Sequence, residues 1–305
     1  PMITPLSLKK GDKIGLIAPA RSGDEQMIAA FTRLAESWGY GIVMGEKLTG
    51  RHGQFAAGDR ERCDDFMRVW KHPEVRAVMA VRGGYGSARL LESLPYDQLQ
   101  KDPKWLAGFS DITALHSALN RYSGMETLHT WMPVSLVLEE KADTESIDSL
   151  RSVLAGEALS YRCPASPFNL PGKAEGRLTG GNLSVLYSLA GTRWEPDYSG
   201  KILLLEDLDE YLYHIDRICL NFDLRGIFSQ IAGLVVGGME QMHDNTVPFG
   251  KDALEIISGY AVKYGFPTFF GFPSGHMPGN RTLIFGRRVT LTVNGESELL
   301  FHPGN

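Results

Sequence analysis

Short apolar runs alternate with amphipathic segments through the first half of the chain, and this alternation restricts the fold more than any other feature. Met27, Phe31, Leu34 and Trp38 recur at spacings of three and four, which is typical of one face of a helix. Strands alternating with helices pair in parallel through crossovers. The sequence therefore predicts a Rossmann-like parallel α/β layer. Its strands are expected at 13–19, 41–45, 77–82 and 105–109, and its helices at 25–40, 59–71 (capped by Asp59), 89–94 and 111–122.

A second, smaller domain is expected after the composition changes near residue 138. A surface helix is predicted at 138–156, and a segment rich in Pro and Gly follows it. We place the boundary between 155 and 172, which gives domains 1–160 and 161–305. The second domain is predicted to be mixed α/β with a β-rich end, and Asn294-Gly295 indicates a hairpin. Its strands are expected at 201–208, 231–238, 267–272, 281–286, 288–295 and 297–301, and its helices at 211–226 and 252–265.

Charge and cysteine content exclude several classes of protein. The 305 residues carry a formal net charge of -5, without the basic field that nucleic-acid binding needs. The chain shows neither a run of 18 apolar residues nor a signal-peptide pattern, so we expect no membrane segment and a cytoplasmic location. Cys63, Cys163 and Cys219 are far apart and lack CxxC spacing, so reduced thiols are expected. No HExxH or clustered histidine favours a metal, and neither metal nor cofactor is expected.

The glycine-rich stretch RGGYGSARLL, residues 82–91, follows a predicted strand and allows three interpretations. It lacks both the GxGxxG dinucleotide fingerprint and the GKS or GKT of a P-loop, which argues against a hydride-transfer enzyme. It is consistent with a tight turn, a phosphate-binding loop, or an oxyanion hole built from backbone N–H groups. The stretch alone does not decide between them.

Ser110, in GFSDITAL, stands at a predicted strand-to-helix turn. The G-x-S-x-G nucleophile pattern fails because Ile112 occupies the last position, and a helix cap is the simpler interpretation. A serine there would nevertheless point toward the carboxyl edge of the sheet, where ligands bind, and the N–H of Asp111 would face a developing oxyanion.

A serine nucleophile also needs a base and a group that orients the base. His276 lies in an irregular segment that fixes a side chain without regular structure, and His129 ends an apolar segment and is a candidate for lining a cleft. Glu206 continues the apolar strand 202–205, where a buried carboxylate needs a partner such as histidine.

Taken in order, these segments resemble the LD-carboxypeptidases, the serine peptidase family that includes muramoyl-tetrapeptide carboxypeptidase. The resemblance rests on KIGLIAPA, AVRGGYGSARLL, GFSDITAL, GRLTGGNLSVLYSLAGT, ILLLEDLDE and SGHMPG, which span nearly the whole chain. It implies a triad of Ser110, His276 and Glu206, with the backbone N–H groups of Gly84 and Asp111 as oxyanion donors. It also implies a homodimer.

The implied substrate is a murein tetrapeptide that loses its terminal D-alanine at an L,D bond during peptidoglycan recycling. The terminal carboxylate needs a cation, for which Arg82 and Arg89 are candidates by position, and Tyr85 lies in the same loop. His129 and Trp131 are expected in a pocket wall. Family members often have a HGP-like sequence where this chain has His129-Thr130-Trp131.

Two alternatives remain. A peptidase of the microcin-immunity type would use the same triad on a peptidyl-nucleotide, and Trp131 would then be a stacking surface. A non-catalytic two-domain protein would hold a nucleotide or sugar at residues 82–86, with Ser110 only a helix cap.

Overall fold

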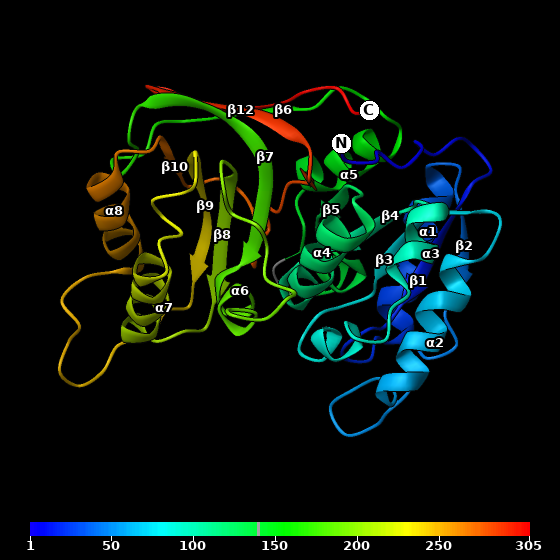
Figure 1. The fold of residues 1–305 in the computed structure, drawn as a ribbon. Helices are drawn as coiled ribbons and strands as arrows, with labels where there is room; N and C mark the ends of the chain where they lie inside the picture. Colours follow the sequence, from blue (N-terminus) through cyan, green and yellow to red (C-terminus); the bar gives the residue numbers. More distant parts are fainter. Residues whose placement is uncertain (139–140) are drawn as a thin grey trace.

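The first half of the chain forms the expected parallel sheet (Figure 1). The structure is a computed structural model, and it describes residues 1–138 and 141–305. Five strands pair in parallel in the order β2-β1-β3-β4-β5. These strands are β1 (Lys13–Ile17), β2 (Gly41–Met44), β3 (Val75–Ala80), β4 (Trp105–Gly108) and β5 (Thr127–His129). The predicted fold class is confirmed for this half.

The helices of this half follow the apolar periodicity, but some begin or end differently from the prediction. The main ones are α1 (Glu25–Ser37), α2 (Asp59–Trp70), α3 (Tyr96–Lys101), α4 (Thr113–Ala118) and α5 (Thr144–Leu154). Gly58, not Asp59, is the N-cap of α2, and Asp59 instead pairs with Arg62 and Arg89. The prediction that Asp59 is the cap is therefore wrong.

Two predicted helices are irregular and a third is shorter. The segment expected to be helical at 89–94 is a 3-10 turn, η1 (Ser87–Leu90). The segment 111–122 divides into a 3-10 turn, η2 (Ser110–Ile112), then α4, then a π turn, η3 (Leu119–Ser123). Helix α5 starts at Thr144, where the side chain of Asp143 accepts the N–H of Ser146. Residues 139–140, within the predicted helix 138–156, lie outside the described residues. A further 3-10 turn, η4, spans Pro133–Leu136.

The second half forms a mixed sheet of seven strands in the order β10-β9-β8-β7-β12-β13-β6. Strands β10 to β7 are parallel, and the β7-β12-β13-β6 portion is antiparallel. The hairpin predicted at Gly295 is confirmed, since Asn294 pairs with Glu296. The strands are β6 (Ser160–Cys163), β7 (Gly172–Asn182), β8 (Ile202–Leu208), β9 (Gly233–Glu240), β10 (Thr268–Phe270), β12 (Arg288–Asn294) and β13 (Glu296–Phe301).

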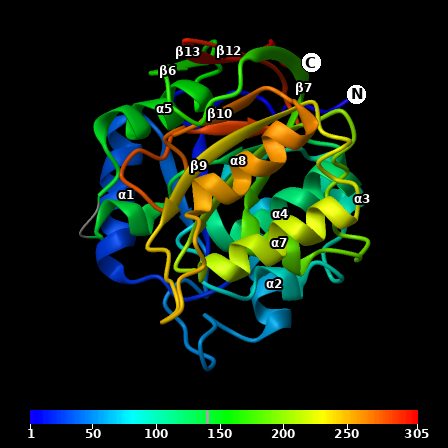
Figure 2. The ribbon, with the colours of Figure 1, turned by 90° about the vertical axis from the view of Figure 1, so that its left-hand side faces the viewer.

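The parallel part of this sheet is covered on both faces, as its apolar strands require. Helices α7 (Leu212–Leu224) and α8 (Ala253–Tyr264) lie across its outer face (Figure 2), and α6 (Leu183–Ser188) packs on the same side. Successive residues of a strand point to opposite faces. Leu203 and Leu205 accordingly join the core beneath the helices, whereas Ile202 and Leu204 join the core shared with the first sheet. None of the helices in the described ranges is long and apolar enough to cross a membrane.

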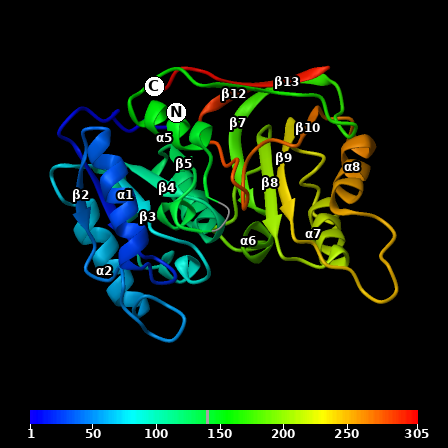
Figure 3. The ribbon, with the colours of Figure 1, turned by 180° about the vertical axis from the view of Figure 1, so that it is seen from behind.

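One strand returns from the second half of the sequence to the first sheet. Strand β11 (Leu283–Phe285) pairs antiparallel with β5, and Leu283 lies opposite His129. We expected this segment in the second domain, but the structure places it at the edge of the first sheet. The chain therefore crosses three times between the two sheets, which lie side by side in Figure 3. The division at residue 160 stays a prediction.

Arg62 is fully buried and holds together the turns at the carboxyl edge of the first sheet. Its guanidinium donates to the carbonyls of Ala57 (3.0 Å) and Gly86 (2.9 Å), to that of Pro19, and to the Asp59 carboxylate at 2.6 Å. The three carbonyls lie in three separate loops and Asp59 begins α2, so Arg62 joins segments that are distant in the sequence.

We expect Arg62→Met to lower the free energy of unfolding by about 3 kcal/mol, because the three carbonyls would stay buried without donors. Urea unfolding followed by circular dichroism measures the change. The matched control is Arg60→Met, whose side chain is 95% exposed and should change stability by no more than about 0.5 kcal/mol. Equal stability of the two variants would contradict this role.

Candidate active site

Ser110 lies directly after β4, in a strained backbone conformation. Its φ is +62°, a left-handed value that is uncommon for a residue other than glycine. Its hydroxyl caps no helix: η2 has Phe109 and α4 has Ile112 as N-cap, neither with a side-chain capping bond. Instead, Ser110 Oγ lies 3.0 Å from His276 Nε2. Strain of this kind is often found at functional sites.

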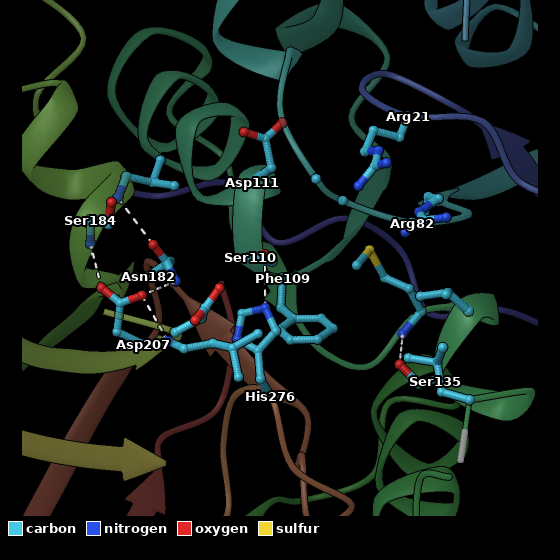
Figure 4. A pocket seen from close by; sticks show the side chains of 18 of the residues that line it. Arg21, Arg82, Phe109, Ser110, Asp111, Ser135, Asn182, Ser184, Asp207 and His276 are labelled. Carbon is cyan, nitrogen blue, oxygen red and sulfur yellow. Dashed lines mark hydrogen bonds between the residues drawn. The ribbon is translucent and has the colours of Figure 1, made fainter. Parts of the chain in front are cut away.

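The partners of Ser110 come from the second half of the chain. His276 lies between β10 and β11, and its Nδ1 is 2.8 Å from Glu206 Oε2. Glu206 is fully buried near the end of β8, and its other oxygen accepts a hydrogen bond of 3.2 Å from Asn182 Nδ2. Asn182 ends β7 directly opposite Glu206 in the parallel register. The structure thus brings together the three residues that the resemblance implied, in an unbroken chain of hydrogen bonds (Figure 4).

Gly275 makes this close approach possible. It has a φ of +109°, and a Cβ built there would lie 2.6 Å from Glu206 Oε2. Its N–H donates to Asn280 Oδ1 at 3.0 Å, which fixes the loop just before His276. The Phe109 ring, with its centroid 4.9 Å from that of the imidazole, packs against the ring of His276. The loop therefore holds the histidine between a carboxylate and an aromatic ring.

The environment of His276 favours its charged form. Burial by itself lowers the pKa of this imidazole, but the charge of Glu206, the hydrogen bond to Glu206 and the charge of Asp207 together raise the pKa above its usual value. An imidazole with a raised pKa is a stronger base, and the negative carboxylate stabilises the imidazolium that forms when it accepts a proton.

The glycine-rich loop after β3 lies beside the nucleophile. A Cβ built on Gly83 would lie 3.4 Å from both Ser110 Oγ and the backbone nitrogen of Asp111. Asp111 ties this loop in place, since its Oδ2 accepts the N–H of Ser87 at 2.8 Å and its carbonyl accepts the Ser87 hydroxyl at 2.7 Å. The Asp111 side chain therefore fixes the position of the glycine-rich loop. The backbone of this loop lies near Ser110.

Asp207 is a second buried carboxyl beside the Ser110–His276–Glu206 chain. Its Oδ1 accepts hydrogen bonds from Asn182 Nδ2 (3.2 Å) and Leu208 N–H (2.8 Å), and its Oδ2 accepts the N–H of Ser184 at 2.9 Å. Burial, and then repulsion from Glu206, raise the pKa of Asp207 to about 7. Asn182 thus donates to both acids through one amide group.

We expect the titration of Asp207 to lower stability as pH rises. The unfolded chain releases this proton near the ordinary value of 3.8, whereas the folded protein keeps it up to about pH 7. The folded state therefore binds more protons between these limits, and stability falls from pH 4 to pH 7, by up to about 4 kcal/mol from this group. Asp207→Asn should remove that loss.

Urea unfolding of the wild type and of Asp207→Asn at pH 4, 5.5 and 7 measures the difference between them. The control is Asp64→Asn, whose side chain is 74% exposed and should leave the pH dependence as in the wild type. A difference between wild type and Asp207→Asn that does not change with pH would contradict a raised pKa.

The hydrogen-bonded chain opens into a cavity of about 540 Å³, and Arg82, Gly84 and Asp111 are among its lining residues. Four other residues predicted to bind substrate lie outside this lining. Tyr85 is exposed and packs against Phe55, and Arg89 pairs with Asp59 at 3.0 Å. Neither side chain lines the cavity that contains Ser110.

His129 and Trp131 are buried inside the first domain. Trp131 has no exposed surface, packs edge-on against Phe31 and donates its indole N–H to the Ser146 carbonyl at 2.8 Å. His129 is also fully buried, and its burial, with the charges of His116 and His276, holds its pKa well below the usual range. Neither side chain is accessible to a ligand, so the expectation that they form a pocket wall is corrected.

Several residues that line the cavity were not predicted, among them three with polar or charged side chains. Arg21 lines the cavity, and Asn182 and Asp207 do so beside Glu206. Asn182 and Asp207 could have been found because TGGN and LLLED both end parallel strands with polar residues. Arg21 carried a weaker signal: it follows β1, whose carboxyl end lies at the same edge of the sheet as that of β3.

No group of three or more His, Cys, Asp and Glu side chains within residues 1–138 and 141–305 is arranged to hold a metal ion. In the site, the hydroxyl of Ser110 contacts the imidazole of His276, which in turn contacts the buried carboxylate of Glu206. Such an arrangement supports nucleophilic attack on a carbonyl carbon.

Comparison with known proteins assigns the family. Residues 14–130 match the LD-carboxypeptidase N-terminal domain and residues 175–291 match the LD-carboxypeptidase C-terminal domain. A probable murein peptide carboxypeptidase of Bacillus subtilis (strain 168) is 32% identical over 95% of this chain and 91% of its own.

Two solved structures share the fold. The muramoyltetrapeptide carboxypeptidase of Oxalobacter formigenes superposes with a TM-score of 0.87 at 30% identity, over 96% of this chain and 99% of its own. A mutant of the microcin C7 self-immunity protein in complex with adenosine monophosphate also gives a TM-score of 0.87, over 99% and 98%, but at 20% identity it shows the fold alone. From the two matched domains and the relatives of full length, the chain belongs to the LD-carboxypeptidase family, a family of serine-type peptidases.

Proposed function

We propose that this protein is a serine carboxypeptidase that removes the terminal D-alanine from murein tetrapeptides at an L,D bond, in the recycling of peptidoglycan. The observation that carries the proposal is the contact chain Ser110–His276–Glu206, with distances of 3.0 and 2.8 Å, at a cavity of about 540 Å³. The names of the Bacillus and Oxalobacter relatives support the choice of murein peptides.

The proposed reaction follows from the positions of the three residues. His276 Nε2 accepts the proton of Ser110 Oγ as that oxygen attacks the scissile carbonyl. Glu206 keeps the Nδ1–H of His276 directed toward itself and stabilises the imidazolium. His276 then protonates the leaving amine of D-alanine, and water hydrolyses the acyl-enzyme by the same steps.

Backbone N–H groups are proposed to bind the oxyanion of the tetrahedral intermediate. The candidates are those of Gly84 and Asp111, which line the cavity beside Ser110. Each such donor contributes about 3 kcal/mol of transition-state stabilisation in enzymes of this type. Neither requires a metal or an organic cofactor.

The test is the release of D-alanine from a purified muramyl tetrapeptide, followed by chromatography. Release by the wild type and none by Ser110→Ala would support the proposal. A folded wild type without activity would overturn the substrate, and a peptidyl-nucleotide of the microcin type would be tried next. Full activity of Ser110→Ala would overturn the nucleophile, and binding without hydrolysis would favour the non-catalytic alternative.

The structure gives the microcin alternative no added support, because Trp131, the stacking surface named for it, is fully buried.

We also propose a cytoplasmic homodimer. Free thiols at Cys63, Cys163 and Cys219 suit a reducing compartment. Leu220 and Leu224, four residues apart on α7, are 43% and 78% exposed, and an apolar face of this kind suits an interface between copies. Sedimentation analysis measures the oligomeric state.

A further inference from the structure

Two arginines on the first-domain side of the cavity have no part in the mechanism above. Arg21 and Arg82 both line the cavity that contains Ser110. Figure 4 shows them next to each other, on the side of Ser110 opposite to Asn182 and Asp207. The cavity therefore has a cationic wall facing an acidic one, with the nucleophile between them.

Neither arginine of this wall forms a salt bridge with an acidic side chain in the described part of the chain. Arg82 is half-buried, and its Nε is fully buried without a hydrogen-bond partner in residues 1–138 and 141–305. Burial, followed by the charge of Arg21, lowers the pKa of Arg82, while Asp24 raises it. Arg62 and Arg89, by contrast, both have Asp59 as an ion-pair partner. A buried guanidinium N–H without a partner is rare in folded proteins, and a bound acceptor would satisfy it.

Arg21 and Arg82 follow two neighbouring strands, β1 and β3. The N–H of Arg21 donates to the carbonyl of Gly83 at 3.3 Å, which joins the turn after β1 to the loop after β3. A Cβ built on Gly84 would lie 2.1 Å from Arg21 Cδ. The absence of a side chain at Gly84 thus lets the Arg21 side chain lie across the loop, toward the cavity.

The separation of β3 and β4 is comparable with the size of the terminal amino acid that the proposed reaction releases. Strand β3, which precedes Arg82, pairs with β4, which precedes Ser110, and neighbouring strands lie about 4.8 Å apart. In a terminal amino acid, the carboxylate carbon lies two bonds beyond the scissile nitrogen. A cation in the loop after the adjacent strand is therefore placed to meet that carboxylate when the scissile carbonyl contacts Ser110.

We propose that Arg21 and Arg82 form a clamp that binds the terminal carboxylate of the peptide and so restricts cleavage to a chain with a free carboxyl end. This inference rests on the proposed function and names the feature of the substrate that the cavity recognises. The planar fork of a guanidinium matches the two oxygens of a carboxylate, and both arginines line the cavity.

A second carboxylate could come from the substrate, since a diaminopimelate at the third position carries one on its side chain. Four tetrapeptides separate the two sources: each has a free acid or an amide at its end, and diaminopimelate or lysine at its third position. The test compares kcat/KM for release of D-alanine or D-alaninamide by the wild type, Arg21→Met and Arg82→Gln. Arg60→Met, an exposed arginine outside the cavity, is the matched control.

The clamp predicts that the wild type prefers acid over amide by about 10- to 100-fold, the range for a hydrogen bond to a charged group. Arg21→Met and Arg82→Gln should each reduce this preference by about tenfold, mainly through KM, whereas Arg60→Met keeps it. An acid-to-amide ratio unchanged in both cavity variants would overturn the clamp. So would a kcat/KM that changes between diaminopimelate and lysine at the third position but not between acid and amide at the end.

Binding measurements keep this test independent of turnover. Titration calorimetry of Ser110→Ala with the acid and the amide, with and without Arg21→Met, reports recognition alone. If the wild type cleaves none of the peptides, the proposed function fails, and a preference for the acid that Arg21→Met reduces still supports the clamp. Equal affinity for acid and amide, or no binding of either, overturns it.

Discussion

Ser110→Ala is expected to lower kcat by about 10⁴- to 10⁶-fold on a murein tetrapeptide, with little change in KM. The loss is large because the hydroxyl is the attacking group, and a serine triad loses nearly all of its contribution when the nucleophile is removed. The residual rate would come from the backbone donors and from binding. Single-turnover kinetics with D-alanine detection measures the change.

Two companion variants separate catalysis from folding. Ser110→Gly also lacks the hydroxyl, but glycine accepts the φ of +62° without strain, so this variant should be inactive and at least as stable as Ser110→Ala. Ser188→Ala removes an exposed hydroxyl on α6 that donates to the Val185 carbonyl at 2.6 Å, and it should keep full activity. Activity of Ser110→Gly above one tenth of the wild type would show that another group attacks.

Glu206→Gln is expected to lower kcat by about 10³- to 10⁴-fold while the fold is kept. The amide has the shape of the carboxylate, but an NH₂ group directed at His276 Nδ1 would donate to it. Nδ1 would then lack its proton, Nε2 would carry it, and the imidazole could no longer accept the proton of Ser110. The loss is therefore one of tautomer and charge, not of packing.

The same variant should move the pH profile. The base acts when neutral, so activity rises with pH through the pKa of His276, which Glu206 holds above its usual value against the effect of burial. Without that negative charge the pKa falls, and the acid limb of kcat/KM shifts to lower pH. Glu175→Gln, on an exposed part of β7 where it pairs with Arg288, is the control that should leave the limb in place. An unshifted limb in Glu206→Gln would show that Glu206 does not set this pKa.

The sequence was sufficient for the parts of the fold that depend on neighbouring residues. Periodicity predicted β1 to β4, α1 and α2, since a buried strand and an amphipathic helix differ in spacing. The positions of Ser110, Glu206 and His276 came from the family resemblance, because 70 residues separate Glu206 from His276 and no local pattern joins them.

The sequence could not predict which side chains are buried, or which contacts form between residues distant in the chain. Trp131 and His129 follow an apolar segment, and that context fits a cleft wall as well as a core. Only the packing of α1 and α5 shows that Trp131 contacts Phe31 and Ser146. Arg89 likewise seemed near the cavity by position, but on the 3-10 turn η1 it pairs with Asp59 and does not line the cavity.

The return of β11 to the first sheet has a consequence for synthesis of the protein. Strand β5 has β4 on one side and gains its other neighbour only from Leu283–Phe285. On the ribosome, the half that carries Ser110 thus keeps an open sheet edge until nearly the whole chain has emerged, and His276 is synthesised just before the strand that closes this edge. A chain that stops before residue 276 would bear a serine without its base, and one that stops before Leu283 would leave the edge of β5 unpaired.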